Sequence, residues 1–182
     1  MIQSTLVFIK QKLDQYLVNL FTLDENITVL NHLVNQDGSY PQKNKNKMVL
    51  TLINLDHGTD KQSKDAKLRA QDNAIGKINP PTRLNIDLLF TASFDDYEQA
   101  LKVLNATITF FQSNNSFNAK TAPDIPSGIK TLNFDIENIS YLEIQNLWSA
   151  MGAKYQPSII YKIRAVTVQN NDIEAIVNPA TE

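Results

Sequence analysis

Hydrophobic residues near the start of the chain repeat at helical spacing. Ile2, Leu6, Ile9 and Leu13 begin a series that continues at steps of three and four residues to Leu20, with polar residues on the opposite side. One face of an α-helix has this spacing. The sequence therefore predicts an amphipathic helix that opens the chain and packs one side against a core.

A second helical pattern covers residues 95–112. Asp95 has the short acidic side chain favoured at a helix N-cap, and Glu98 follows three residues later, as in a capping box. Capping explains the adjacent carboxylates Asp95 and Asp96 better than acid–base or metal chemistry does, because helix N-termini favour negative charge. The predicted buried stripe consists of Tyr97, Ala100, Leu101, Leu104, Ile108 and Phe111.

A third helix is predicted between residues 140 and 151. Ser140 and Glu143 form another capping-box pair, and Gly152 stands where a glycine commonly ends a helix. Trp148 is interpreted as a core anchor, because a large aromatic side chain on an apolar helix face usually packs inside. The predicted apolar face consists of Ile144, Leu147, Trp148 and Met151.

Strand patterns separate these helices. Residues 48–55 are almost continuously apolar, which predicts a central strand covered on both faces. Residues 83–92 alternate, with Asn85, Asp87 and Thr91 on the polar face. We interpret this polar face as solvated, with the lining of a lumen as the alternative for Asp87. Further strands are predicted at residues 27–30, 130–136 and 158–168, the last of these being the final strand.

Polar segments connect the predicted elements. Residues 35–47 are expected to form a loop or hairpin tip, and residues 57–81 an excursion with a helical turn or two over residues 66–74. Residues 113–128, which contain two prolines, are expected to form a functional or mobile loop. The tail, residues 169–182, is polar and expected to be loose.

The order of these elements predicts the fold class. Several strands follow one another without an intervening helix, so an α/β (α+β) domain is expected, with a mixed or mostly antiparallel sheet flanked by about three helices. We expect one domain over residues 1–168 and a polar C-terminal tail over residues 169–182.

Composition excludes several classes of function. The chain has 182 residues, is 42% hydrophobic and carries a formal net charge of -2, so it can bury a core but offers no strong field for DNA or an anionic membrane. It contains no cysteine, which rules out disulfides and thiolate chemistry. Neither a secretory signal nor an apolar run of membrane-spanning length is apparent. We expect neither nucleic acid nor a membrane as partner.

Residues that could perform chemistry are sparse. The five glycines are isolated from one another, so no phosphate-binding loop is present. The two histidines, His32 and His57, lie far apart in sequence, and neither a hydrolase motif nor zinc-ligand spacing surrounds them. No catalytic residue, metal site or cofactor is therefore expected.

One basic and aromatic grouping stands near the end of the predicted domain. Lys154 and Tyr155 precede the final strand, which carries Tyr161, Lys162 and Arg164. Lys162 and Arg164 share one strand face by their spacing of two. The slight acidity of the whole chain disfavours nucleic-acid binding by this cluster. A protein contact or a ring lumen is as good an explanation as solvation, and we predict these five as partner-binding residues.

Two longer segments resemble a known family. The first runs from Leu84 through Asp95 and Asp96 to Leu101, and leads to Phe110-Phe111-Gln112. The second covers residues 146–158, with Trp148-Ser149, Gly152 and Lys154-Tyr155-Gln156-Pro157-Ser158, and leads to Tyr161-Lys162-Ile163-Arg164. Together they resemble the N-terminal domain family of the cap, or tail-terminator, proteins of contractile injection systems of the antifeeding-prophage and virulence-cassette type.

The resemblance implies a structural function. The chain would be a cap subunit in a ring of six that ends polymerisation of sheath and inner tube and anchors the upper end during contraction. Its partners would be copies of itself, the sheath and the inner tube. It would be made in the cytoplasm and become part of the assembled particle. The alternatives are a terminator of a true contractile phage or a cell-anchored type VI-like system, and a generic adaptor or small-molecule-binding α/β domain.

Overall fold

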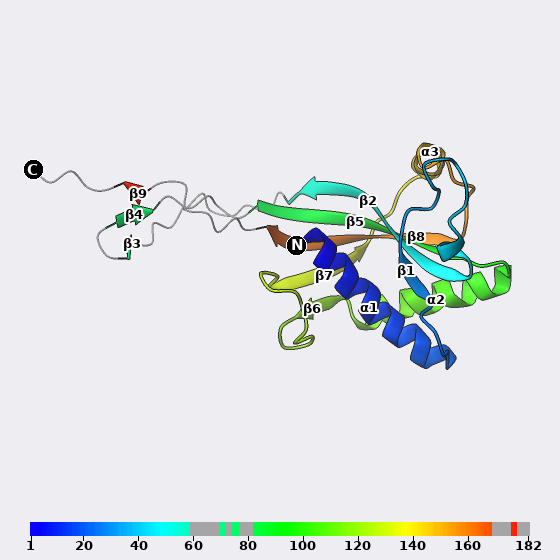
Figure 1. Cartoon of the computed structure of the whole chain (residues 1–182), viewed down its shortest axis with the longest axis horizontal. Helices are drawn as coiled ribbons and strands as arrows, with labels where there is room; N and C mark the ends of the chain where they lie inside the picture. The colour runs from blue at the N-terminus through cyan, green and yellow to red at the C-terminus, as the bar shows by residue number, and fades with distance from the viewer. Residues whose placement is uncertain (59–69, 72–73, 77–81, 169–175, 178–182) are drawn as a thin grey trace, which may run out of the picture.

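The computed structural model describes residues 1–58, 70–71, 74–76, 82–168 and 176–177 (Figure 1). Three α-helices occur in this part: α1 (Ile2–Phe21), α2 (Tyr97–Ser113) and α3 (Tyr141–Ala150). A short 3₁₀ helix spans Gln42–Asn44. The helices expected at the start, middle and end of the domain are thus confirmed.

One six-stranded sheet organises the chain. Its strands are β1 (Thr28–Leu30), β2 (Lys47–His57), β5 (Thr82–Ser93), β6 (Ser116–Asn118), β7 (Thr131–Ile136) and β8 (Ser158–Val168). Their spatial order is β1-β2-β5-β8-β7-β6, and every neighbouring pair is antiparallel except β1 and β2. This confirms the expected single α+β fold with a mixed, mostly antiparallel sheet.

A second, small sheet contains β3 (Ala70–Gln71), β4 (Ala74–Gly76) and β9 (Ile176–Val177). The helical turn expected over residues 66–74 is wrong at Ala70–Gln71 and Ala74, which are strand; the other residues of that range lie outside the described part. Strand β9 also shows that β8 is not the final strand and that the tail contains regular structure. The domain boundaries at residues 168 and 169 stay a prediction.

Helices α1 and α2 cover one face of the large sheet, which we call the inner face (Figure 1). Leu13 and Leu17 of α1, Phe111 of α2 and Phe90 of β5 are at most 2% exposed in the cluster between them. Helix α3 lies on the opposite, outer face, where Trp148 packs with a smaller buried cluster. Figure 1 shows α1 and α2 on one side of the sheet and α3 on the other. The predicted role of Trp148 as a core anchor is confirmed.

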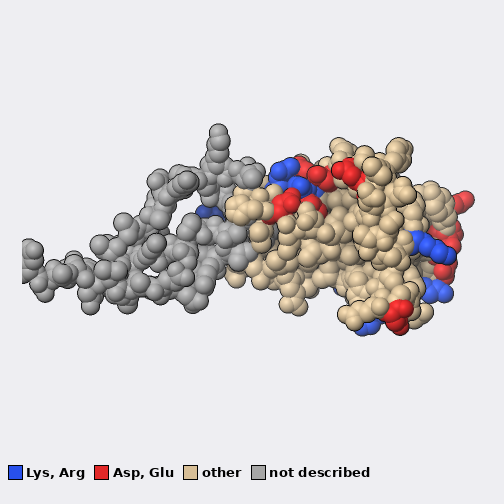
Figure 2. Space-filling model, turned by 90° about the horizontal axis from the view of Figure 1, so that it is seen from above, with Lys and Arg blue, Asp and Glu red and all other residues tan. Residues whose placement is uncertain are grey.

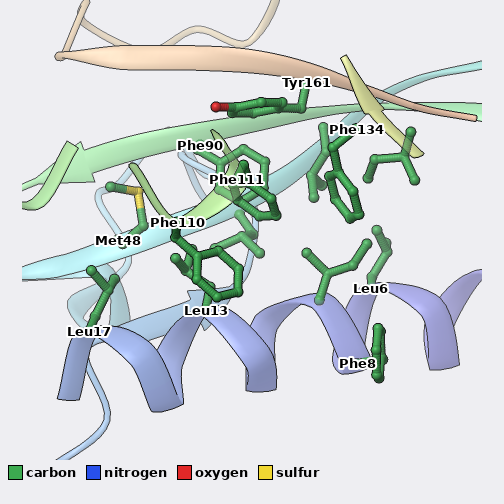
Figure 3. Packing of buried hydrophobic residues seen from close by; sticks show 14 of the residues in the cluster. Leu6, Phe8, Leu13, Leu17, Met48, Phe90, Phe110, Phe111, Phe134 and Tyr161 are labelled. Atoms are coloured by element: carbon green, nitrogen blue, oxygen red, sulfur yellow. The ribbon is translucent and has the colours of Figure 1, made fainter. Parts of the chain in front are cut away.

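Aromatic rings fill the centre of the inner face (Figure 3). The ring of Phe111 lies 4.7 Å from that of Phe134, 4.8 Å from that of Tyr161 and 5.2 Å from that of Phe90, centroid to centroid. Such pairs contribute about 0.5–1.5 kcal/mol each beyond the burial of their area. They join α2 to three neighbouring strands and so determine how the helix lies on the sheet.

A buried carboxylate joins α1 to the first strand. Asp14 is 7% exposed, and its Oδ1 accepts hydrogen bonds from the backbone amides of Ile27 and Thr28 at 3.0 and 2.8 Å and from Thr28 Oγ1 at 2.7 Å. A buried charge is tolerated when it is hydrogen-bonded in this way. Asp14 thereby holds the start of β1 against the helix.

The start of α2 differs from the sequence expectation. The N-cap is Asp96, not Asp95, and its carboxylate accepts from the amides of Glu98 and Gln99 at 2.8 and 3.4 Å. The predicted buried stripe is also wrong at Tyr97 and Leu101, which are 66% and 43% exposed. The residues that face the core are Ala100, Val103, Ala106, Thr107, Phe110 and Phe111.

Both ends of α3 follow the prediction. Ser140 Oγ accepts from the Glu143 amide at 3.3 Å, and the Glu143 carboxylate accepts from the Ser140 amide at 2.7 Å, which completes the capping box. Gly152 has φ of +64°, and the amides of Gly152 and Ala153 donate to the carbonyls of Ser149 and Trp148. This is the Schellman pattern, and it requires a residue that tolerates the left-handed conformation.

Several connecting segments depart from the sequence expectation. Residues 35–47 connect two parallel strands, so they form a loop but not a hairpin. The loop expected over residues 113–128 contains the edge strand β6. Strand β2 is buried on both faces only over Met48–Leu50, whereas Leu52 and Leu55 are 38% and 41% exposed. Strand β1 pairs with β2 only as far as Leu50.

Candidate assembly surfaces

A row of polar residues crosses four strands on the uncovered half of the outer face. Asn54 of β2 pairs with Asp87 of β5, Asp87 with Lys162 of β8, and Lys162 with Asp135 of β7. Directly paired residues point to the same side of a sheet, so these four side chains share one face. Figure 2, seen from above relative to Figure 1, shows acidic and basic side chains gathered in one patch there.

Lys162 lies at the centre of this polar row. Its Nζ donates to Asp56 Oδ2 at 2.9 Å and lies 3.5 Å from Asp87 Oδ1 and 3.7 Å from Glu137 Oε1. The Lys162 side chain is 16% exposed and that of Asp87 11%. Three carboxylates therefore share one largely buried ammonium, and the excess charge of this cluster is negative.

The contact between Lys162 and Asp56 shifts the pKa values of the two groups in opposite directions. The hydrogen bond to Asp56, with the charges of Asp87 and Glu137, raises the pKa of Lys162 against the opposing effect of desolvation. The hydrogen bond from Lys162 lowers the pKa of Asp56. Asn54 Nδ2 also donates to Asp56 Oδ1 at 2.9 Å and to Asp87 Oδ2 at 3.0 Å. Hydrogen bonds among Asn54, Asp56, Asp87 and Lys162 thus hold these side chains in place.

The burial of Asp87 corrects its interpretation as part of a solvated face. The residue is 8% exposed, because strands β2 and β8 lie on either side of it and supply Asn54 and Lys162. The sequence prediction did not assign Asp56, Asp135 or Glu137 to a common site. The signal that would have found them is a pair of acidic or amide residues two apart at the end of an apolar strand: Asn54 with Asp56, and Asp135 with Glu137.

The five residues predicted to bind a partner fall into separate places. Tyr161 is 2% exposed and packs in the aromatic core, where burial raises the pKa of its phenol to about 12. Its proposed surface contact is therefore wrong, because residue 161 points to the inner face while residue 162 points to the outer one. Arg164 is exposed, and its Nε donates to Asp135 Oδ2 at 2.7 Å. Lys162 and Arg164 share the outer face, as their spacing indicated.

Lys154 and Tyr155 lie elsewhere, after the end of α3. Both are exposed, and the Tyr155 ring meets that of Trp148 edge-on at 5.4 Å. Tyr155 borders a groove of about 610 Å³, which Tyr40 and Tyr97 also line. Exposed tyrosines are favoured in protein interfaces because one end is apolar and the other can hydrogen-bond. The partner-binding role of Lys154, Tyr155, Lys162 and Arg164 stays a prediction.

Strand β8 has no free edge over Tyr161–Arg164, because β5 and β7 pair with it on its two sides.

Within the described residues, no three His, Asp or Glu side chains come together as a metal site would require. His32 Nε2 lies 3.1 Å from Asn35 Oδ1 in an exposed loop, and His57 ends β2 at the surface. The described helices include none that is long and apolar enough to cross a lipid bilayer.

The fold defined above is that of subunits that terminate contractile particles. It matches the sheath/tube terminator, in its extended state, of the PVC extracellular contractile injection system with a TM-score of 0.52 and 16% identity, over 75% of this chain and 47% of that one. It matches the tube-terminating cap of the anti-feeding prophage with a TM-score of 0.60 and 12% identity, over 96% of this chain and 57% of that one. The chain thus spans about half the length of the solved proteins that it matches.

The sequence of the chain gives the family directly. The family described as the Pvc16 N-terminal domain matches residues 6–182, and the chain belongs to it. No curated protein sequence matches the chain. The resemblance based on the two segments around residues 84–112 and 146–164 is confirmed.

Proposed function

We propose that the chain is the cap, or terminator, subunit of an extracellular contractile injection system. The observation that carries this proposal is the family match over residues 6–182 in a chain that has the fold of two solved terminators. We further propose a ring of six copies that ends sheath and inner-tube growth and holds the upper end during contraction. The role is structural, and the protein acts as a component of the assembled particle.

Stacked rings grow by head-to-tail contacts, which remain open-ended until one face is blocked. A terminator therefore needs one surface that fits the growing end and another that does not repeat it. The sheet of this chain has two unlike faces. Its inner face is closed by α1 and α2, whereas half of its outer face carries the charged cluster around Lys162.

The proposal is tested on particles that lack the subunit. Without it, sheaths and tubes are expected to vary widely in length, and adding the purified chain, or the longer protein if it is part of one, should restore a uniform length in electron micrographs. Light scattering should give six times 20.5 kDa, about 123 kDa, for a ring of this chain. Uniform lengths without the subunit would contradict termination. A monomer at every concentration, alone and with sheath ends, would contradict the ring.

The same experiment separates the alternatives. A terminator of a true phage or of a cell-anchored system would cap only the tubes of that machine. A generic adaptor would form no ring and would leave the length of tubes unchanged.

A further inference from the structure

Strand β1 lies beside only the first part of strand β2. Strand β1 pairs with it in parallel over Met48–Leu50, whereas β5 accompanies β2 as far as His57. In the described part of the chain, no strand pairs with residues 52–57 of β2 on the side that β1 has left. We call residues 52–57 the open edge.

Backbone groups at the start of the open edge point away from β5. The Met48 amide donates to the Ile27 carbonyl at 2.7 Å, and the Leu50 carbonyl accepts from the Asn31 amide at 3.1 Å, so both residues direct backbone groups toward β1. Successive residues of a strand direct these groups to alternate sides. The amide and carbonyl of Leu52 consequently face the position that a continuation of β1 would occupy.

A bulge brings two leucines onto one face beside this edge. The register with β5 shifts between Leu52 and Asn54, so that Leu52 is opposite Leu88 and Leu55 is opposite Ile86. Both leucines consequently lie on the inner face, where they are 38% and 41% exposed. A shallow groove of about 380 Å³ continues from Leu52 along Leu6, Leu30 and Leu50. An incoming strand could place apolar side chains there at every second position.

The opposite face beside the open edge is negatively charged. Asn54 and Asp56 point to the outer face, and Asp56 belongs to the cluster in which three carboxylates share Lys162. Residues of an incoming strand that alternate with the apolar ones would face this cluster. Electrostatic complementarity favours Lys or Arg at those positions. The neighbouring sequence of β2, from Thr51 to His57, contains no Lys or Pro of the kind that commonly protects an edge strand.

We propose that the open edge of β2 receives an extended segment of another protein of the particle, with apolar residues at alternate positions and basic residues between them. The segment adds a strand to the sheet, so main-chain hydrogen bonds supply affinity and the alternation supplies specificity. This inference rests on the proposed function, because it assigns that function's partner contact to named residues.

The test compares charged substitutions at two exposed places. Leu52→Lys/Leu55→Lys puts charges on the inner face at the open edge, whereas the control Leu142→Lys alters a leucine of α3 that is 65% exposed. Binding of each variant to the ends of purified particles lacking the subunit is measured, with urea denaturation as a check of folding. We expect the double variant to bind at least about tenfold more weakly, because charges at positions 52 and 55 would face the apolar side chains of the incoming strand. The control should bind normally.

A photo-crosslinking residue at position 52 identifies the occupant in assembled particles, independently of the double variant. The cross-link should map to an extended segment of another protein of the particle that has the apolar and basic alternation, and a cross-link to a second copy of this chain would overturn the inference. Wild-type binding by a folded double variant would overturn the inference and leave the proposed function intact. A cross-link confined to the chain's own residues 59–69, or to a helix, would do the same. If the wild-type chain itself fails to bind particle ends, the proposed function fails and the inference fails with it.

Discussion

The two faces of the large sheet are made by the same strands but are stabilised in different ways. On the inner face, Phe90 and Tyr161 of neighbouring strands pack against Phe111 of α2. On the outer face, one position away along each of the same strands, Leu89 and Ile160 pack under α3, and further on Asp87 and Lys162 form an ion pair. The inner face is stabilised by the burial of apolar side chains. The uncovered half of the outer face is stabilised by ion pairs between particular residues. The comparison suggests that the inner face determines the fold and the outer half is available for assembly.

Removing a ring from the inner face should have the largest effect. Phe111→Ala deletes a fully buried side chain that contacts Phe90, Phe134 and Tyr161. We expect the free energy of unfolding to fall by about 3–5 kcal/mol, because the substitution loses burial and leaves a cavity. Urea denaturation measures the change. Tyr97→Ala on the same helix, 66% exposed, is the control and should stay within about 0.5 kcal/mol of wild type. A similar loss in both variants would contradict the described orientation of α2.

Removing the central cation of the outer face should have an intermediate effect. Lys162→Met leaves Asp87, 8% exposed, beside Asp56 and Glu137 without a cation between them. We expect a loss of about 1–3 kcal/mol in the free energy of unfolding, because a buried group has lost its partner. Lys154→Met, at an exposed lysine, is the matched control and should be nearly neutral.

The double variant Lys162→Met/Asp87→Leu separates charge from packing. Replacing both partners of a buried pair by apolar groups is commonly close to neutral. Most of the stability lost in Lys162→Met should therefore return in the double variant, measured in the same denaturation series. A further loss in the double variant would mean that Asp87 stabilises the fold independently of Lys162, through contacts such as the hydrogen bond that it accepts from Asn54.

Local sequence patterns predicted the elements of both faces better than they predicted the charge partners. The alternation around Phe90 indicated β5, and Ser140 with Glu143 indicated the start of α3, because both signals lie within a few residues of the element that they specify. The partners of Lys162 come from two other strands and from the residue that follows β7, and Asp56 is 106 positions away. A pattern of period two does not contain that information, since the bulge in β2 and the register between strands decide which carboxylates meet.

The N-cap of α2 shows a second limit of local patterns. Asp95 and Asp96 both satisfy the chemistry of a cap, and only the path of the chain leaving β5 selects Asp96. In that path the Asp95 amide donates to Asn46 Oδ1 at 2.9 Å, a contact with a distant loop. The predicted stripe is a separate error, because apolar spacing alone placed Tyr97 and Leu101 inside, although both are exposed.

The smallest effect at neutral pH is expected from Tyr161→Phe, which tests whether this residue belongs to the inner face. The hydroxyl of Tyr161 is buried and makes no hydrogen bond among the described residues. Its loss should leave the free energy of unfolding unchanged or slightly higher, because a buried hydroxyl without a partner carries a desolvation cost. Binding to particle ends should be unaffected. If the folded variant bound particle ends more weakly than wild type, Tyr161 would belong to the partner-binding surface after all.

Alkaline pH makes the same substitution more informative. Burial raises the pKa of Tyr161 to about 12 from 10.0, so the unfolded chain releases this proton at lower pH than the folded protein does. The folded state binds more protons in this window, and stability therefore falls as the pH rises above 10 toward 12. Phenylalanine at position 161 removes this contribution, so the difference in stability between variant and wild type should grow in favour of the variant across that range. Urea denaturation at intervals from pH 9 to 12 measures the difference, in which the titration of the remaining tyrosines and lysines cancels. A constant difference across this range would show that the phenol is accessible to water, and the division between the two faces would no longer hold at β8.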